Sequence, residues 1–283
     1  YEIMPSLVGS EMCIRDSYRS VPMEDLIEQA KSLVEQGAKE LILVAQETTL
    51  YGVDLYGEKS LHKLLDELNK ISGLFWIRIM YCYPEEIYDE LIESMIKDEK
   101  VCHYLDMPIQ HCNDDILRRM GRKTTKAELM ERIRMLRERI PDITLRTTLI
   151  CGFPGETQYN HEELMQFVND MEFDRLGAFT YSPEEGTKAA AMPDQIDEQI
   201  KAARSEKLIA LGHDMSKEFR KFYIGKNEEV LFEEKAVIGD KEYFVGYTKE
   251  YVKVAKKTDE NLENQIVSGR ISGMLTDEIL LFE

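Results

Sequence analysis

Several polar side chains stand at or near the ends of predicted β-strands, where they could bind a small polar ligand. They are Gln46, Asp106, Gln110, Arg146 and Glu156. A polar group that interrupts a buried strand costs free energy unless it has a partner or a ligand. For any one of these residues, hydrogen bonding between strands explains the position equally well. Their shared position near the carboxyl ends of strands favours a binding site at that edge of a sheet.

The segment RTTLICGFPGE, residues 146–156, is the most informative of these strand ends. An apolar strand leads into a Gly-Pro-Gly turn, and a helical pattern follows from about Thr157. A glycine in such a turn lets a ligand approach the backbone, because no Cβ is in the way. The turn lacks the GxxxxGK[ST] spacing of a P-loop, so it is not predicted to cradle phosphates in that way.

Two Cys-His pairs, Cys102-His103 and His111-Cys112, raise the alternative of a metal site. Adjacent residues of a strand point to opposite faces, and the spacing differs from the C-x-x-C pattern of metal sites. Buried thiols and a hydrogen-bonded histidine explain these pairs better. The chain also contains no GxSxG or HExxH motif.

The elements that must position these residues alternate between strand-like and helix-like patterns from about residue 22. Strands are predicted at 40–45, 74–81, 101–109, 143–151 and 174–181, and helices at 26–34, 61–68, 84–96, 114–120, 126–139 and 162–171. Repeated βα units with buried strands predict an α/β fold, whose parallel sheet carries helices as an open or closed barrel.

The pattern changes after residue 193. A long helix is predicted to open at Pro193 and close at Gly225, with an apolar stripe formed by Ile196, Ile200, Ala203, Leu208, Leu211, Met215, Phe219 and Phe222. Five short strands follow, at 229–232, 243–247, 251–254, 265–271 and 278–282. Glycine, aspartate and asparagine turns separate them, which is typical of a small all-β barrel.

Composition limits the classes of function. The 283 residues carry a net charge of −18, which disfavours nonspecific binding to nucleic acid and favours basic partners. Five scattered cysteines indicate a reducing cytosol rather than a disulfide framework. No apolar run approaches the ~20 residues that a membrane-spanning helix needs. We therefore expect a cytoplasmic protein that does not associate with membranes.

The first seventeen residues do not fit the βα pattern. Residues 4–17, MPSLVGSEMCIRDS, look like adapter-derived sequence, and the regular pattern resumes at Tyr18. A divergent N-terminus is the alternative. We expect residues 1–17 to be a non-native segment.

Several long motifs resemble the radical S-adenosylmethionine (SAM) methylthiotransferase family. They are YRSVPMEDL, LVAQETTLYG, LFWIRIMYCYPEE, YLDMPIQHCNDDILRRMGR, TTLICGFPGET and AFTYSPEEGT. The likeness covers about residues 18–283, and the tail resembles a TRAM domain. It implies a partial (βα)6-type radical SAM barrel over residues 18–216 and a TRAM barrel over 217–283.

Within that family, LVAQETTLYG and WIRIMYCYPEE resemble the RimO-type branch, which acts on a ribosomal protein. The resemblance implies methylthiolation of an aspartate β-carbon in small-subunit ribosomal protein twelve. The implied cofactors are SAM and 4Fe-4S clusters, with a reductant such as flavodoxin or ferredoxin. Residues 225–283 hold eight Lys and Arg against thirteen Asp and Glu, which favours a basic protein substrate over nucleic acid.

Two other functions stay open. One is the tRNA-modifying MiaB-type sibling, for which a basic tail would have been expected. The other is a non-catalytic module that docks basic proteins.

The resemblance also assigns candidate SAM-binding residues by their positions in the motifs. Ile150 and Gly152 would lie along the adenine and ribose. Polar groups of SAM would be contacted by Gln46, Gln110 and Arg146. The adenine would be flanked by Phe179 and Tyr181. Glu156 closes the same turn. No residue is assigned a catalytic or metal-binding role, because the CxxxCxxC motif of the family is absent and only Cys13 precedes Tyr18. We therefore expect the chain as written to bind no complete cluster and to lack methylthiotransferase activity.

Overall fold

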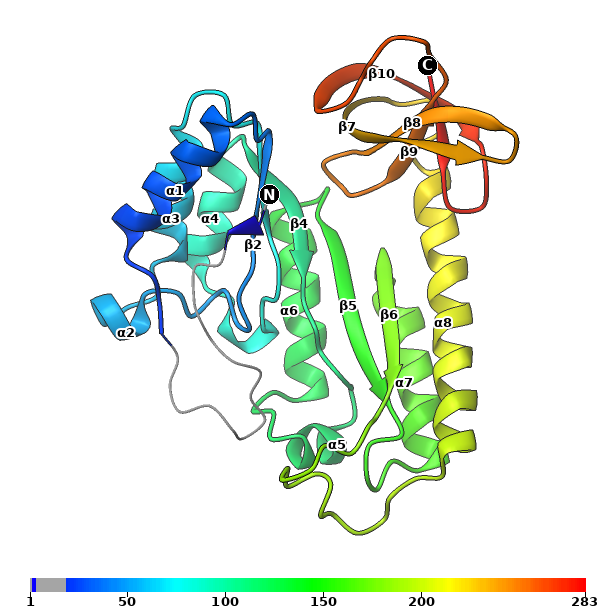
Figure 1. The fold of residues 1–283 in the computed structure, drawn as a ribbon. Helices are drawn as coiled ribbons and strands as arrows, with labels where there is room; N and C mark the ends of the chain where they lie inside the picture. The colour runs from blue at the N-terminus through cyan, green and yellow to red at the C-terminus, as the bar shows by residue number, and fades with distance from the viewer. Residues whose placement is uncertain (1, 4–18) are drawn as a thin grey trace.

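The computed structural model describes residues 2–3 and 19–283 (Figure 1). The segment predicted to be non-native therefore lies outside the described residues, except for Glu2 and Ile3. Cys13 also lies outside them.

A sheet of six parallel strands forms the larger part of the molecule, and its strand order follows the chain from β1 to β6. The strands are β1 (Glu2–Ile3), β2 (Glu40–Leu43), β3 (Trp76–Ile79), β4 (Val101–Asp106), β5 (Thr144–Cys151) and β6 (Arg175–Thr180). The β1 and β6 strands are the two edges, so the sheet is open. The predicted fold class is confirmed.

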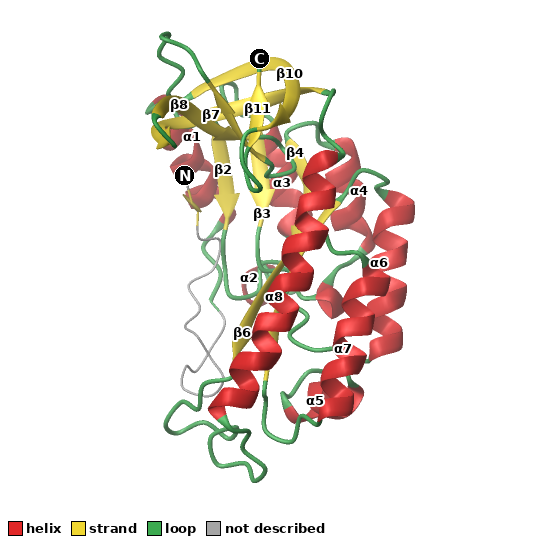
Figure 2. Ribbon diagram, turned by 90° about the vertical axis from the view of Figure 1, so that its right-hand side faces the viewer, coloured by secondary structure: helices red, strands yellow, loops and turns green. Residues whose placement is uncertain are grey.

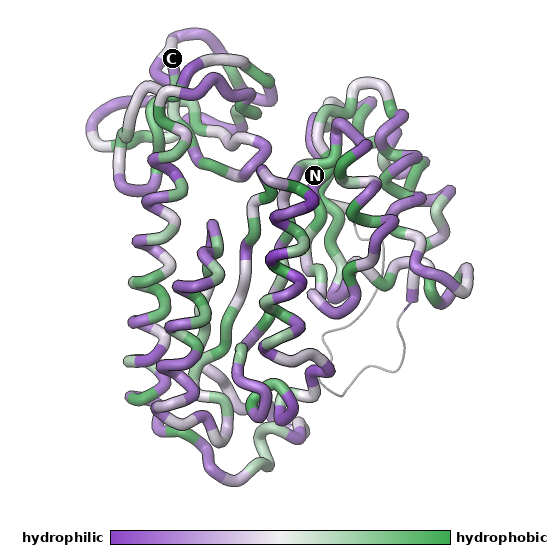
Figure 3. Tube along the Cα trace, turned by 180° about the vertical axis from the view of Figure 1, so that it is seen from behind, coloured by the Kyte–Doolittle hydropathy of each residue, from purple (hydrophilic) through white to green (hydrophobic). Residues whose placement is uncertain are grey.

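Helices accompany this sheet, and most of them cover one of its faces. They are α1 (Met23–Glu35), α2 (Val53–Tyr56), α3 (Leu61–Asn69), α4 (Asp89–Lys97), α5 (Asp114–Arg119), α6 (Lys126–Arg139), α7 (Gln158–Met171) and α8 (Glu198–Lys221), with a 3₁₀ turn η1 (Pro84–Glu86). The short α2, by contrast, has no buried residue. Figure 2 shows α3, α4, α6 and α7 together on one side of the strands. Along the trace, the helices alternate between hydrophilic and hydrophobic residues (Figure 3), as expected for elements buried on one side.

The core lies between these helices and the sheet. Leu41, Leu105, Leu145 and Leu149 point from the strands into the helical layer and are fully buried. Because side chains alternate along a strand, the residues between them face the other, concave side. The burial pattern of β5 follows this rule, with Arg146, Thr148 and Ile150 only partly buried.

The predicted helix 84–96 is two elements, the turn η1 and the helix α4. The short helix α2 was not predicted. The long helix begins at Glu198 rather than Pro193, because Asp197 adopts an extended backbone and its carboxylate accepts the N–H of Gln199 at 2.9 Å. This is an ordinary N-cap, and it sets the first residue of α8.

The predicted apolar stripe of α8 is wrong at its ends. Ile200 and Phe222 are 46% and 66% exposed, whereas Leu208 is buried as predicted. The first half of the helix instead buries Lys201 and Arg204. Both cations contact the turn after β5, which the helical pattern alone does not show.

The five predicted C-terminal strands form a closed barrel in the order β10-β11-β9-β8-β7. They are β7 (Asn227–Ile238), β8 (Lys241–Tyr247), β9 (Lys253–Lys256), β10 (Gln265–Met274) and β11 (Leu280–Phe282). The predicted domain boundary at 216 and 217 falls inside α8, which runs on to Lys221. That boundary and the assignment of a TRAM domain stay predictions.

The barrel packs on the amino ends of the parallel strands. Arg78 of β3 is fully buried, and its Nη1 donates to the carbonyl oxygen of Lys249 at 2.6 Å. Its guanidinium lies 4.9 Å from the ring centre of Tyr104 and 4.4 Å from that of Tyr251. Figure 1 shows the barrel at the end of the sheet from which β4, β5 and β6 point away. The carboxyl ends of the strands, where the candidate residues lie, are therefore not covered by the barrel.

Candidate functional site

The candidate site begins on the concave face of β5 and β6. In their register, Thr148 lies beside Gly177 and Ile150 beside Phe179. Phe179 is 60% exposed, and a Cβ on Gly177 would meet only ordinary contacts. These four residues make a flat, partly apolar surface on which a planar ring could lie.

Gln110 extends this surface toward β4. Its backbone continues the sheet, since its N–H donates to Thr148 and its carbonyl oxygen accepts the N–H of Ile150, at 3.0 and 2.8 Å. The residue has a backbone φ of +67°, which is uncommon for a residue other than glycine. Its side-chain Oε1 is buried and has no hydrogen-bond partner among the described residues. An unsatisfied amide oxygen at this place fits a ligand that brings a donor.

Arg146 is paired within the sheet. Its Nη1 donates to Oδ1 of Asp106 at 2.6 Å, and Asp106 is the register partner of Arg146. Burial raises the pKa of Asp106, and the positive charge of Arg146 opposes this shift. About 30% of the Arg146 side chain remains exposed, whereas Asp106 is almost completely buried. Arg146 therefore holds a buried carboxylate and still presents charge to the concave face.

Gln46 lies at the same edge of the sheet but further away, just after β2, with β3 between it and β4. The segment is tied to the end of β3, because the N–H of Thr48 donates to the carbonyl oxygen of Tyr81 at 3.0 Å. Tyr181 is buried against Phe153, with ring centres 5.2 Å apart, and Ile150 packs on the same cluster. Thus Ile150 and Phe179 are direct neighbours, Arg146 lies further back on the same strand beside Arg175, and the backbone of Gln110 pairs with Leu149. Tyr181 packs in the same cluster as Ile150.

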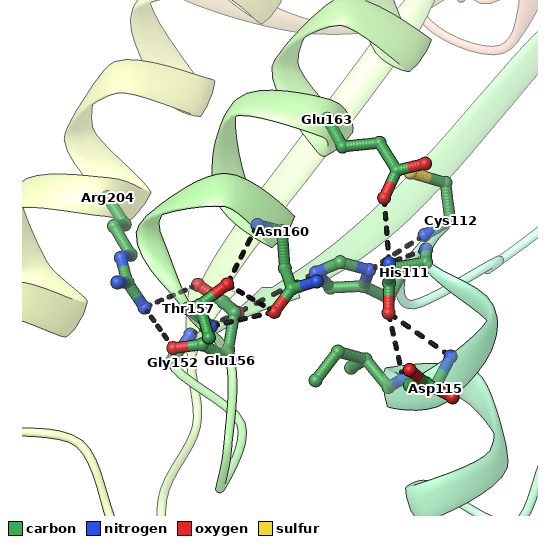
Figure 4. A network of polar contacts seen from close by, with 11 residues as sticks. His111, Cys112, Asp115, Gly152, Glu156, Thr157, Asn160, Glu163 and Arg204 are labelled. Carbon is green, nitrogen blue, oxygen red and sulfur yellow. Dashed lines mark hydrogen bonds and ion pairs between the residues drawn. The ribbon is translucent and has the colours of Figure 1, made fainter.

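The turn after β5 is held by its own carboxylate (Figure 4). The Oε2 of Glu156 accepts the N–H of Gly152 at 2.7 Å, and its Oε1 accepts Nη1 of Arg204 at 2.8 Å. Burial raises the pKa of Glu156, while the Gly152 N–H and Arg204 oppose the shift. The Glu156 side chain is fully buried. In this structure the carboxylate stabilises the turn and does not face the concave surface.

Position 152 requires glycine for two reasons: its backbone conformation and the close approach of a side chain from α8. It has φ +75, and a Cβ would stand 2.2 Å from Cγ of Lys201. The sequence predicted open space for a ligand beside this glycine, but the aliphatic part of Lys201 occupies that space on one side. A ligand can reach the turn only from its other side.

A buried histidine supports the turn from the end of β4. The Nδ1 atom of His111 accepts the N–H groups of Cys112 and Asn113, both at 2.9 Å, which places the ring proton on Nε2. Nε2 lies 3.7 Å from Oε2 of Glu156. Burial lowers the pKa of His111 to about 3, so the ring is neutral. In Figure 4, His111 lies between the turn and α5.

The sequence did not point to Lys201, Arg204 or His111 as supports of the site. A lysine and an arginine on a helix are typical of its solvent face, and for His111 the sequence predicted a hydrogen-bonded histidine in preference to a metal ligand, without indicating what it supports. The two glycines of the turn are the sequence feature that could have indicated these supports. Both have positive φ, and side chains from other elements pack against them.

The described cysteines do not suit an iron–sulfur cluster. Cys82, Cys102, Cys112 and Cys151 are all unpaired and fully buried. Burial raises the pKa of the Cys102, Cys112 and Cys151 thiols to about 12, which disfavours the thiolate that binds metal. Across residues 2–3 and 19–283, no group of three or more His, Cys, Asp or Glu side chains is placed to hold a metal ion. His103 is hydrogen-bonded to Asp142 at 2.7 Å.

Within the described part of the chain, no helix has the length and apolar character needed to cross a bilayer.

Two cavities, of about 410 and 690 Å³, lie along α8 rather than on the concave face of β5.

Comparison with known proteins agrees with this geometry. A family model, the Radical SAM superfamily, matches residues 10–168. The chain is 55% identical over 235 residues to "Ribosomal protein uS12 methylthiotransferase RimO" of Lachnoclostridium phytofermentans, a match that covers 83% of this chain and 53% of that protein. It is 51% identical over 237 residues to the protein of the same name from Clostridium perfringens, with 84% and 52% covered. The chain thus spans about half the length of the curated relatives it matches.

Solved structures show the same fold at low sequence identity. Methylornithine synthase (PylB) is 14% identical with a TM-score of 0.53, over 76% of this chain and 62% of that one. Coproporphyrinogen III oxidase (HemN) from Escherichia coli, titled a radical SAM enzyme, is 16% identical with a TM-score of 0.50, over 68% and 46%. The family match covers more than half of the sequence, and the sheet has the parallel order that this fold requires. The chain belongs to the radical SAM superfamily.

Proposed function

We propose that this chain is part of a methylthiotransferase that modifies ribosomal protein uS12, at an aspartate β-carbon. The observation that carries the proposal is 55% identity, over 83% of the chain, to a relative whose name states that activity. The proposal covers the activity of the whole protein, because this chain spans about half the length of the relatives it matches.

SAM is the cofactor that the concave face fits. The flat surface of Thr148, Ile150 and Phe179 suits the adenine, and the buried Oε1 of Gln110 suits a donor on the ligand. The exposed part of Arg146 suits the carboxylate of the methionine moiety. SAM, together with a 4Fe-4S cluster, would supply the chemistry that removes a hydrogen atom from an unreactive C–H bond.

The residues of this chain would orient the cofactor. The Asp106–Arg146 pair fixes the guanidinium, so little side-chain freedom is lost when a carboxylate binds. The ion pair between Glu156 and Arg204 fixes the turn beside Ile150. Because the described cysteines do not fit a cluster, no step is assigned to them.

A basic substrate agrees with the charge of the chain, −18 overall, and with the acidic C-terminal barrel. The unpaired thiols of the four described cysteines suit a cytoplasmic location, and the resemblance favours flavodoxin or ferredoxin as the reductant.

Binding of SAM to the chain tests the cofactor site without requiring catalysis. By isothermal titration calorimetry, Phe179→Ala and Arg146→Ala should each weaken SAM binding about tenfold or more, as one stacking or charged contact is lost. Tyr159→Ala is the matched control, since Tyr159 is 72% exposed on α7. Unchanged affinity in both variants, with the control behaving as expected, would remove the concave face as the cofactor site.

The activity itself is tested with the full-length protein. After anaerobic reconstitution with iron and sulfide, it should add a methylthio group to uS12, seen by mass spectrometry of the uS12 peptides. Modification of tRNA in place of uS12 would instead support the sibling function.

A further inference from the structure

A cavity separate from the concave face lies between α8, the start of β6 and the C-terminal barrel. This interdomain cavity has a volume of about 410 Å³. Its cationic lining comes from three elements: Arg175 of β6, Arg220 of α8 and Lys253 of the barrel. Such a group of positive side chains is unexpected in a chain with a net charge of −18.

Arg220 supplies the observation that points to a ligand. Its Nε and Nη2 atoms are buried, and neither has a hydrogen-bond partner among the described residues. Burial lowers the pKa of Arg220, and the neighbouring charge of Arg175 lowers it further. Two guanidinium groups held together in this way are stabilised when an anion joins them.

The acidic residues of the lining do not satisfy these donors. The carboxylate of Asp174 accepts the N–H of Leu145 at 2.8 Å and so is engaged with β5. Glu278 is exposed at the rim; its charge favours the Arg220 cation, but no hydrogen bond joins the two in this structure. Asp277 accepts from Lys217 at 2.8 Å. The buried donors of Arg220 therefore remain available to an oxyanion.

The other lining residues suggest the size and chemistry of the ligand. The cavity is within the size range of small-molecule sites and larger than one oxyanion requires. Phe219 and Tyr247 place aromatic surface beside the two arginines. We propose that this cavity binds a small phosphate monoester, with its phosphate on Arg175 and Arg220 and its organic part against Phe219 and Tyr247. Arginine is suited to this role, because its planar fork can donate two hydrogen bonds to one phosphate.

The test uses phenyl phosphate, which has no adenine and so avoids the proposed SAM site. Isothermal titration calorimetry should show phenyl phosphate binding to the full chain more tightly than inorganic phosphate, and no binding of phenol. Arg220→Gln should weaken the binding of phenyl phosphate at least about tenfold, because a charge-assisted hydrogen bond is lost. Arg134→Gln is the matched control, since it removes the same charge from an exposed position on α6.

Lys253→Gln provides a second variant if Arg220→Gln lowers the melting temperature, and it should also weaken binding. Equal binding of phenyl phosphate by the wild type and both lining variants would overturn the proposal. So would binding that needs Arg220 but is seen only with a single-stranded oligouridylate, since the surface would then serve a nucleic acid. Neither outcome bears on the proposed methylthiotransferase activity, which is measured separately.

Discussion

At the scale of single residues, the turn after β5 is shaped by side chains from other elements that pack against its glycines. Gly152 and Gly155 both have positive φ, and a Cβ on either would overlap a side chain, Lys201 in one case and Arg119 in the other. Glycine is thus needed at position 152 for packing against the stem of Lys201, whereas at Gly155 the overlap involves only the movable end of Arg119 and the positive φ is the main requirement. Glu156 completes the arrangement by accepting the N–H of Gly152.

We predict that Gly152→Ala lowers the free energy of unfolding by about 2–4 kcal/mol, since positive φ and the contact with Lys201 both oppose a Cβ. Gly186→Ala is the matched control, because Gly186 has φ +83 with nothing within 4 Å of its added Cβ. It should cost only the backbone part, about 1–2 kcal/mol. Urea denaturation measures both, and equal costs would show that Lys201 moves aside freely.

His111 gives the turn a dependence on pH. Its pKa falls from 6.5 to about 3 on burial, so between these values the unfolded chain binds a proton that the folded chain does not. Stability contributed by the neutral ring is therefore complete above pH 6.5 and decreases as the pH falls toward 3, by up to about 1.4 kcal/mol per pH unit.

We predict that His111→Gln flattens the fall of the unfolding free energy over this range. Above pH 6.5 the difference between variant and wild type should be constant, which gives an internal control for lost packing. Parallel curves for the two proteins down to pH 4 would contradict the prediction. Chemical denaturation at a series of pH values provides the measurement.

At the scale of elements, α8 connects the turn to the rest of the molecule. Its buried face carries Lys201 and Arg204, whose charged groups bind the carbonyl oxygen of Tyr181 and the carboxylate of Glu156 at 3.1 and 2.8 Å. A helix that buries cations against a strand-end turn fixes the geometry of the turn. Hydrophobic contacts alone would leave the helix freer to slide.

We predict that Arg204→Met destabilises the fold by about 3 kcal/mol, because the buried carboxylate of Glu156 loses its cation. Adding Glu156→Gln to the variant should restore part of the loss, since no buried charge then remains. Arg118→Met is the control: it breaks an ion pair with Asp115 whose side chains are 73% and 76% exposed, and should change stability by less than about 0.5 kcal/mol. Additive effects of Arg204→Met and Glu156→Gln would show that the two residues do not act together.

At the scale of the whole molecule, the C-terminal barrel closes the amino end of the sheet and leaves the carboxyl end accessible. Arg78 is central to this contact, because it bonds to Glu40 at 2.7 Å and to the backbone of Lys249 and lies between two tyrosine rings. Arg175 also donates to the backbone of Tyr251. These two arginines therefore add hydrogen bonds to an apolar cluster in which Trp76 and Tyr104 of the sheet pack with Leu231 and Tyr251.

We predict that Arg78→Met loosens the barrel from the sheet. Amide hydrogen exchange at residues 248–252 should become faster, while exchange in the core of β5 changes little. Arg134→Met, on the exposed face of α6, should leave both regions as in the wild type. Unchanged exchange at 248–252 would show that the other contacts are sufficient to hold the barrel.

The sequence by itself determined the elements and the family. Apolar alternation and periodicity identified the strands β2 to β11 and most of the helices, because these patterns record which face of each element is buried. The motif around Ile150 and Gly152 indicated the strand end beside which Gln110 and Phe179 lie. These are local signals, and each can be read from neighbouring residues.

The tertiary structure alone decided how the turn is held and where charge is buried. Lys201 and Arg204 follow Glu156 by more than forty residues, and nothing in the helical pattern distinguishes them from a solvent-facing cation. Glu156 was expected near the ligand, yet its carboxylate is turned inward to Arg204. The physical reason is that burial of a charge depends on its partner, and only the folded chain brings the two partners together.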